Sequence, residues 1–318
     1  MSPRSPKHPP LNPVQRWNMA LVTLASAVYG CLLIWAPHTD NASSIHLAPW
    51  VTLVLSLSIL GLLVFSWLAG FYAWLQLDRY ANRLSHGRRR QAFRQMAGGV
   101  RLLATGLIIS ILLNATKPFF AQDAGLTTVV TQVNYYIIIL FPFLGFLWLR
   151  QGSKYLAAAA QTAMSLGTKL LTITPPVLLL GGFYIFLALT NSTPETLILL
   201  SGPTGFLVLP TNIILVVGSW VLGLLAALNI ERSTHHGTIN TRPLVRLYNG
   251  ILLMTGGFII LDAVMSLGNT RLLALPLSVT LILVYAFVLV IALGFWSIAV
   301  SGGQLSVEDQ ARADGHPA

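Results

Sequence analysis

Long apolar runs alternate with short polar segments along almost the whole chain. A membrane-spanning α-helix needs about 20 predominantly apolar residues, with about 17 to 25 observed. Eight segments meet this requirement: residues 17–36, 50–77, 98–118, 133–149, 170–189, 211–230, 247–267 and 272–300. The pattern therefore predicts an all-α fold, a polytopic membrane helix bundle with eight transmembrane helices.

The segments outside these spans divide the chain further. Residues 1–16 hold five prolines and three cations, and residues 301–318 are short and polar, so both are interpreted as disordered cytoplasmic tails. Residues 150–169 are alanine-rich with polar ends, which predicts a cytoplasmic or interfacial helix. This helix would separate transmembrane helices 1–4, within residues 17–149, from helices 5–8, within residues 170–300.

Two segments allow a second interpretation. The first span follows a basic region and contains Ala25-Ser26-Ala27, a sequence that fits a signal-peptide cleavage site. A retained helix is favoured, because cleavage there would leave nine apolar residues at the new terminus. Residues 197–210 are apolar but are broken by Gly202-Pro203. A re-entrant segment and an apolar surface loop fit this pattern equally well.

The distribution of positive charge predicts the orientation. Short loops rich in Lys and Arg stay on the cytoplasmic side of a membrane. With eight spans, 17 of the 19 Lys and Arg residues fall on one side, and only Lys117 and Arg271 lie near the other. Residues 78–95 contain six of these cations: Arg79, Arg83, Arg88, Arg89, Arg90 and Arg94. We therefore expect a multi-pass protein of the cell membrane with both termini in the cytoplasm.

Composition and charge predict which molecules the protein contacts. Charged residues make up 9% of the chain, against about 25% in soluble domains, and the net charge is +10. Because the cations lie beside apolar spans, anionic lipid headgroups are the expected partner and nucleic acid is not. The six arginines of residues 78–95 are the predicted lipid-binding residues. The single cysteine, Cys31, excludes an intrachain disulfide.

The two halves of the chain share short sequence matches. Spans 1–4 and 5–8 would have the same orientation, as parallel repeats require. The matches are Leu-Gly-Leu-Leu at 60–63 and 222–225, Thr-Gly at 105–106 and 255–256, and Leu-Gly-Phe at 144–146 and 293–295. Short matches also arise by chance in a chain rich in Leu and Gly. Two parallel four-helix repeats and an unrepeated bundle both remain open.

Polar residues within the spans are few. Asp262 is the only acidic residue in a span, and such residues are functional candidates by default. At helical spacing it shares a face with Thr255 and Ser266 in the seventh span. A similar stripe in the third span consists of Ser110, Asn114 and Lys117. The two stripes predict either a hydrated path between these helices or hydrogen bonds that hold the bundle together.

Catalytic and metal-binding motifs are absent from the sequence. All seven histidines lie outside the spans, so paired haem ligands are missing, and His235-His236 has no further ligand at suitable spacing. We therefore expect no enzyme activity, no catalytic residue, no cofactor and no metal. Two function classes remain: a small-solute or ion permease, and a non-catalytic structural or assembly subunit. The subunit would bind other membrane proteins or further copies of itself.

Overall fold

The computed structural model describes residues 49–85, 87–116, 119, 122–159, 174, 178, 205–236, 241–268 and 277–313. The described residues form six long helices and no strand. These are α2 (Pro49–Arg83), α3 (Arg88–Thr116), α4 (Ala124–Ala159), α7 (Gly205–His236), α8 (Thr241–Gly268) and α9 (Leu277–Ala313). Each contains a segment long and apolar enough to cross a membrane. The all-α prediction is confirmed, with six of the eight predicted spans described.

Two predicted spans fall outside this description. Residues 17–36 are not described at all, and only positions 174 and 178 are described within residues 170–189. The described part has the architecture of a multi-pass membrane helix bundle. The predicted count of eight spans remains a prediction.

The helices are longer than the apolar spans. Most of the predicted loop at residues 78–95 is helical, because α2 continues to Arg83 and α3 begins at Arg88. The tail predicted as disordered from residue 301 is helical as far as Ala313. Hydropathy reports only the part of a helix that lies in lipid, whereas helix formers such as Arg, Gln and Leu continue the helix into water.

Other boundaries also differ from the prediction. α4 passes through Pro142 and continues unbroken to Ala159, so residues 150–159 do not form a separate interfacial helix. α7 begins at Gly205, so residues 205–210 are helical instead of part of a re-entrant loop. Residues 150–159 include Arg, Lys and Ser, which lower the hydropathy without breaking the helix.

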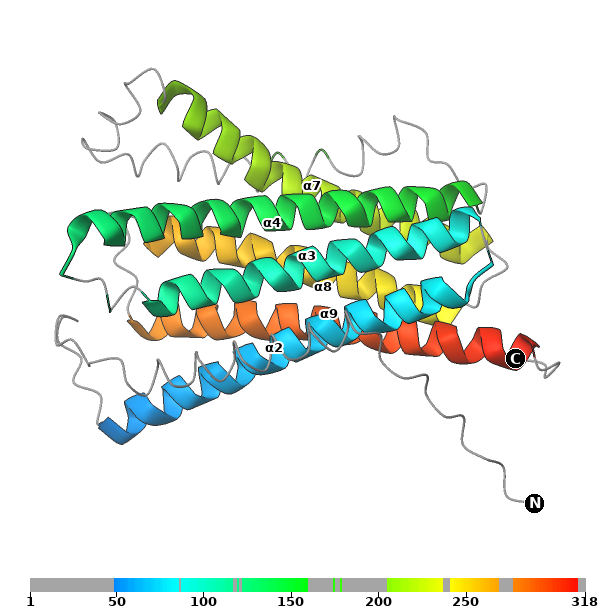
Figure 1. Cartoon of the computed structure of the whole chain (residues 1–318), viewed down its shortest axis with the longest axis horizontal. Coiled ribbons are helices and arrows are strands. Elements are labelled where there is room, and N and C mark those ends of the chain that lie inside the picture. Colours follow the sequence, from blue (N-terminus) through cyan, green and yellow to red (C-terminus); the bar gives the residue numbers. More distant parts are fainter. Residues whose placement is uncertain are drawn as a thin grey trace.

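The six helices form a closed ring (Figure 1). Each helix packs against two neighbours in the order α2, α3, α4, α7, α8, α9 and back to α2. Helices α2, α4, α7 and α9 run in one direction, and α3 and α8 return in the other. One apolar core includes buried side chains from all six helices. In this order α3 and α8 occupy opposite positions in the ring.

Close glycine contacts recur in the two halves. Gly70 of α2 lies against Ala104 of α3 and Phe295 of α9. In the same way, Gly223 of α7 lies against Thr255 of α8 and Phe146 of α4. These contacts pair α2 with α7, α3 with α8 and α4 with α9, so the units α2–α4 and α7–α9 make corresponding helix contacts.

The contacts also fix the register between the halves. The Leu-Gly-Phe segments at 144–146 and 293–295 occupy equivalent positions, since Phe146 and Phe295 make equivalent contacts. The Leu-Gly-Leu-Leu segments do not, because Gly223 pairs with Gly70, whereas a Cβ on Gly61 would meet no atom within 4 Å. The Thr-Gly matches are offset by one residue, since Thr255 pairs with Ala104.

Candidate functional site

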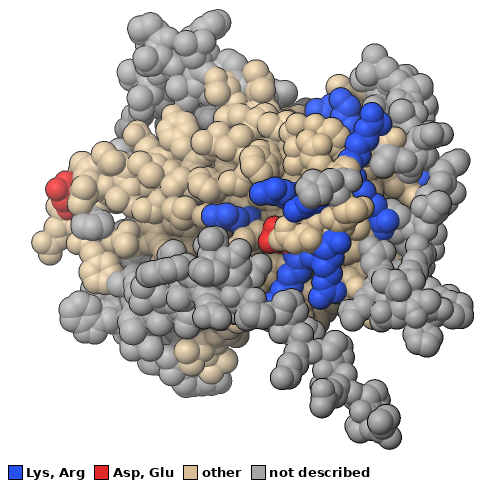
Figure 2. Space-filling view, turned by 45° about the vertical axis from the view of Figure 1, so that its right-hand side comes forward, with Lys and Arg blue, Asp and Glu red and all other residues tan. Residues whose placement is uncertain are grey.

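Basic residues gather at one end of the bundle. At this end α2, α4, α7 and α9 finish and α3 and α8 begin, and Figure 2 shows the Lys and Arg side chains clustered over it. The residues concerned are Arg79, Arg83, Arg88, Arg89, Arg90, Arg94, Arg150, Lys154, Arg232, Arg242 and Arg246. Among the described side chains, the opposite end carries a single charged group, Asp123 at the start of α4.

Asp123 has a local role in the fold. Its carboxylate accepts a hydrogen bond from the backbone N–H of Leu126 at 3.0 Å. This contact caps the first turn of α4, where backbone N–H groups lack helical partners. The charged residue at this end is therefore accounted for by helix capping.

Arg89, one of the six predicted lipid-binding arginines, binds other residues of the chain. Arg89 donates a hydrogen bond to the hydroxyl of Tyr80, and its guanidinium carbon lies 5.8 Å from the centre of the Tyr80 ring. The Tyr80 ring in turn packs edge-on against Phe93, with ring centres 4.7 Å apart. Tyr80 and Phe93 are both fully buried. Arg89 therefore ties the end of α2 to the start of α3.

Arg83 makes a second internal contact. Its Nη1 donates to the hydroxyl of Ser306 in α9 and lies 3.5 Å from the carbonyl oxygen of the same residue. This contact joins α2 to α9 at the basic end. Arg83 and Arg89 thus act in packing, whichever ligand their remaining donors contact.

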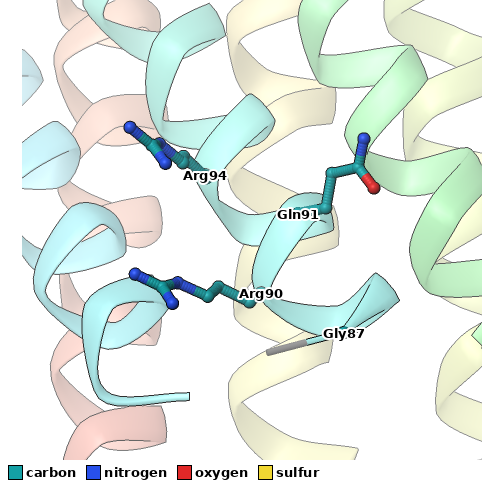
Figure 3. Close-up of a pocket in the computed structure, with 4 residues that line it drawn as sticks. All are labelled: Gly87, Arg90, Gln91 and Arg94. Carbon is teal, nitrogen blue, oxygen red and sulfur yellow. The ribbon is translucent and has the colours of Figure 1, made fainter. Parts of the chain in front are cut away.

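The first turns of α3 carry positive charges that are well placed to bind an anionic headgroup. A pocket of about 300 Å³ is lined by Gly87, Arg90, Gln91 and Arg94. The side chains of Arg90 and Arg94 extend to the same side, one helical turn apart, whereas Gln91 extends to the other side (Figure 3). Arg88 and Arg94 are exposed. Two guanidinium groups beside a helix N-terminus form a setting suited to a phosphate group.

Gly87 allows the chain to enter α3 at this point. Its φ of 156° is a conformation that residues with a side chain rarely adopt. The carbonyl oxygen of Gly87 accepts a hydrogen bond from the N–H of Gln91 at 3.2 Å, which begins the helix. The short turn therefore places Arg88, Arg90 and Arg94 directly after the end of α2.

The predicted polar path is described only in part. Thr255 is buried, donates to the carbonyl oxygen of Ile251 at 2.8 Å, and lies against Gly223 of α7. Ser110 is buried in α3. The side chains of Asn114, Asp262 and Ser266 and the whole of Lys117 lie outside the described residues. The meeting of the two stripes therefore stays a prediction.

Apolar side chains of α3 and α8 pack into the core of the bundle. Leu103 and Leu107 of α3 and Met254 and Phe258 of α8 are buried there. The Phe258 ring packs edge-on against Phe146, with centres 5.7 Å apart. These described side chains of α3 and α8 therefore belong to the apolar core.

A buried polar contact between the halves was missed by sequence reasoning. Asn229 of α7 donates through Nδ2 to the hydroxyl of Ser153 in α4 at 3.2 Å, and both side chains are buried. At the equivalent position of the other interface, Gln76 of α2 lies against Gly302 of α9. Neither pair belongs to a motif. Only an alignment of the two halves in the register of Gly70 and Gly223 would have indicated them.

Among the described residues, no group of three His, Cys, Asp or Glu side chains is placed to hold a metal ion. No protein-family model matches the chain, and no curated protein or solved structure matches it. The function is therefore argued from the geometry of this chain alone.

Proposed function

We propose that the protein is a non-catalytic structural or assembly subunit of a larger membrane complex, held in the bilayer with its basic end toward anionic lipid headgroups. The observation that supports this most is the apolar core shared by all six described helices. A permeation path needs polar or hydrated lining near the membrane centre. The described core offers tight packing at this depth instead.

The polar groups inside the bundle support the same function. The buried hydroxyl of Thr255 is used within its own helix, and Asn229 is used to join α7 to α4. Hydrogen bonds between membrane helices typically contribute about 0.6–2 kcal/mol to association. The Asn229 contact thus joins two helices, and the Thr255 hydroxyl is satisfied within its own helix.

The basic end supports the proposed lipid contact. Arg88 and Arg94 are exposed at the start of α3, beside the pocket that Arg90 lines. A cation near an anionic leaflet contributes about 1 kcal/mol of binding free energy. These positions face the headgroup region if the basic end lies in the cytoplasm, as the charge distribution predicts.

The test is the composition and activity of the protein extracted with its native lipids. We expect a fixed stoichiometry with partner subunits, no solute flux after reconstitution, and lower thermal stability or partner retention for Asp262→Asn. The amide keeps the shape of the carboxylate and removes only its charge. A protein that is isolated alone and shows flux that Asp262→Asn abolishes would contradict the subunit proposal.

A small-solute or ion permease is the second candidate. The equivalent contacts of Gly70 and Gly223 favour it, because many transporters consist of repeats with a binding site where the repeats meet. In this proposal the two units are parallel four-helix repeats, completed by residues 17–36 and 170–189. Flux that is lost in Asp262→Asn while the melting temperature is unchanged would support the permease.

A further inference from the structure

The outward face of α9 carries an uncharged stripe at heptad spacing. Its residues recur at alternating intervals of three and four along the helix, and four of them are exposed by 45% or more of their surface: Leu289, Leu293, Trp296 and Val307. The full stripe consists of Ala286, Leu289, Leu293, Trp296, Val300, Gly303 and Val307. This spacing lets a second helix pack along α9 in a left-handed coiled coil.

Contact with lipid explains an apolar outward face only at the depth of the hydrocarbon. The stripe extends about 27 Å from Leu289 to Val307 and reaches the basic end of the bundle. Val307 follows Ser306, whose hydroxyl accepts a hydrogen bond from Arg83. At this level Val307 is still 68% exposed. The last turns of the stripe therefore call for a covering group other than acyl chains.

The equivalent helix α4 becomes polar at this level. Counted from the equivalent phenylalanines of the two helices, Gln151 and Lys154 of α4 correspond to Val300 and Gly303 of α9. Gln151 and Lys154 are exposed. The same outward face thus carries a cation in α4 and stays uncharged in α9. This difference between the two halves favours protein contact at the end of α9.

Symmetry and charge favour a second copy of the chain as the partner. A twofold axis along the membrane normal places each residue near the axis opposite its own counterpart. A charged residue there would face the same charge, so such a contact needs an uncharged face. The stripe of α9 meets this condition, whereas the face of α4 that contains Lys154 does not. The heptad positions agree, because Val300 and Val307 fall at a and Leu289 at d, a choice that favours parallel two-stranded packing.

A groove beside the stripe offers space for the second helix. It has a volume of about 400 Å³ and lies between α2 and α9. The Trp296 ring lies 6.1 Å from that of Phe65 in α2, centre to centre, so this large side chain is turned toward α2. Gly303 lets a neighbouring helix approach closely. The groove is lined by Tyr72, Trp296, Ala299, Val300, Gly303, Gln304 and Val307.

We propose that α9 forms a parallel, twofold-symmetric interface with α9 of a second copy of this chain. Val300 and Val307 face their own counterparts at the axis, and Gly303 brings the two helices close together. Each α9 then covers the groove of the other copy. The inference is independent of the proposed function, because a dimer of this kind suits a subunit and a permease equally.

The first test is disulfide cross-linking of the full chain in native membranes. Val300→Cys and Val307→Cys are made singly in a Cys31→Ser background and treated with a mild oxidant. Facing a positions bring the two Cα atoms within the range of about 4.4–6.8 Å that a disulfide needs, so both variants should give a covalent dimer that a reductant separates. Gln151→Cys is the matched control, since it is exposed at the equivalent position of α4. It should remain largely monomeric.

The second test uses charge and depends on self-contact. Val307→Lys and Val307→Glu each place like charges opposite one another, so each should weaken dimerisation in detergent by about tenfold or more. An equimolar mixture of the two variants with different tags should recover a mixed dimer, because Lys then faces Glu. Ala158→Lys adds the same charge at the equivalent, exposed position of α4 and should leave the dimer unchanged. Native mass spectrometry measures the monomer and dimer masses.

Folding is checked by circular dichroism of the same variants. Because Val307 is largely exposed within one copy, both charge variants should keep the helical content of the wild type. Absence of a covalent dimer from both cysteine variants would overturn the proposal, as would equal cross-linking of Gln151→Cys or failure of the mixed dimer to form. Cross-linking of Val300→Cys to a different protein would assign this face to another subunit and also overturn it.

Discussion

Gly99 of α3 and Gly145 of α4 hold their helices so close together that a Cβ on Gly99 would stand 2.6 Å from the carbonyl oxygen of Gly145. Gly250 of α8 and Gly294 of α9 repeat this arrangement, with a corresponding distance of 2.8 Å. Small residues let membrane helices approach in this way, where the hydrophobic effect gives no advantage to helix association over lipid contact. The two glycine pairs therefore bring equivalent helices of the two halves into backbone contact.

Alanine at these positions should separate the helices. We expect Gly99→Ala and Gly250→Ala each to lower the free energy of unfolding by about 1–3 kcal/mol, because the added methyl meets backbone atoms that cannot move aside. The measurement is the denaturant or thermal midpoint in a mild detergent. Gly256→Ala is the control: a Cβ there meets no atom within 4 Å, so it should be neutral or stabilise α8 by about 0.5–1 kcal/mol. A midpoint for Gly99→Ala at or above that of the control would contradict the close contact.

The hydrogen bond between Asn229 and Ser153 should stabilise the packing of α7 against α4, which completes the ring of six helices. Asn229→Ala removes the bond at 3.2 Å and leaves a buried space between α7 and α4, so we expect a loss of about 1–2 kcal/mol in unfolding free energy. Asn82→Ala is the matched control, because Asn82 is exposed and bonds only within α2, to Asp78 at 3.1 Å. Its loss should be below about 0.5 kcal/mol. Equal losses of unfolding free energy in the two variants would show that the buried hydrogen bond contributes no more than the exposed one.

The arginines at the start of α3 should separate into two groups. Arg94→Gln should weaken binding to vesicles that contain anionic lipid by about 1 kcal/mol, less at high salt, and leave the melting temperature unchanged. Arg89→Gln should lower the melting temperature instead, because it removes the hydrogen bond and the ring contact at Tyr80. Vesicle flotation and thermal unfolding in detergent measure the two effects. The distinction fails if Arg89→Gln reduces lipid binding more than Arg94→Gln while leaving stability unchanged.

The sequence predicted the membrane class well and the details of the helices less well. Apolar runs marked all six described helices, since burial in lipid requires about 20 apolar residues. They did not mark the helical turns that continue past the predicted spans, such as Arg79–Arg83 and residues 150–159. These turns include Arg, Lys and Asn, which lower the hydropathy, although the backbone remains helical.

Residue pairing was harder to predict than helix position. The Leu-Gly-Phe match identified Phe146 and Phe295 correctly as equivalent, whereas Leu-Gly-Leu-Leu paired Gly223 with the wrong glycine. A match of four residues carries little information in a chain this rich in Leu. The equivalent positions are identified instead by close contacts such as that of Gly70 with Ala104. Thr255 of the predicted polar stripe lies against Gly223 of α7, a contact that no periodicity in α8 alone reveals.

The orientation in the membrane is open to direct measurement. Single cysteines at Ser43, Ser85, Ser192 and Thr238, each in a Cys31→Ser background, are treated with a thiol reagent that cannot cross the membrane. Ser85 is exposed in the turn between α2 and α3, and the other three positions lie outside the described residues. Because 17 of 19 cations fall on one side of the eight-span arrangement, Ser43→Cys and Ser192→Cys should react in intact cells. Ser85→Cys and Thr238→Cys should react only after lysis. Labelling of Ser85→Cys in intact cells would place the basic end outside, and the anionic leaflet of the cytoplasmic side could then no longer be what Arg88 and Arg94 contact.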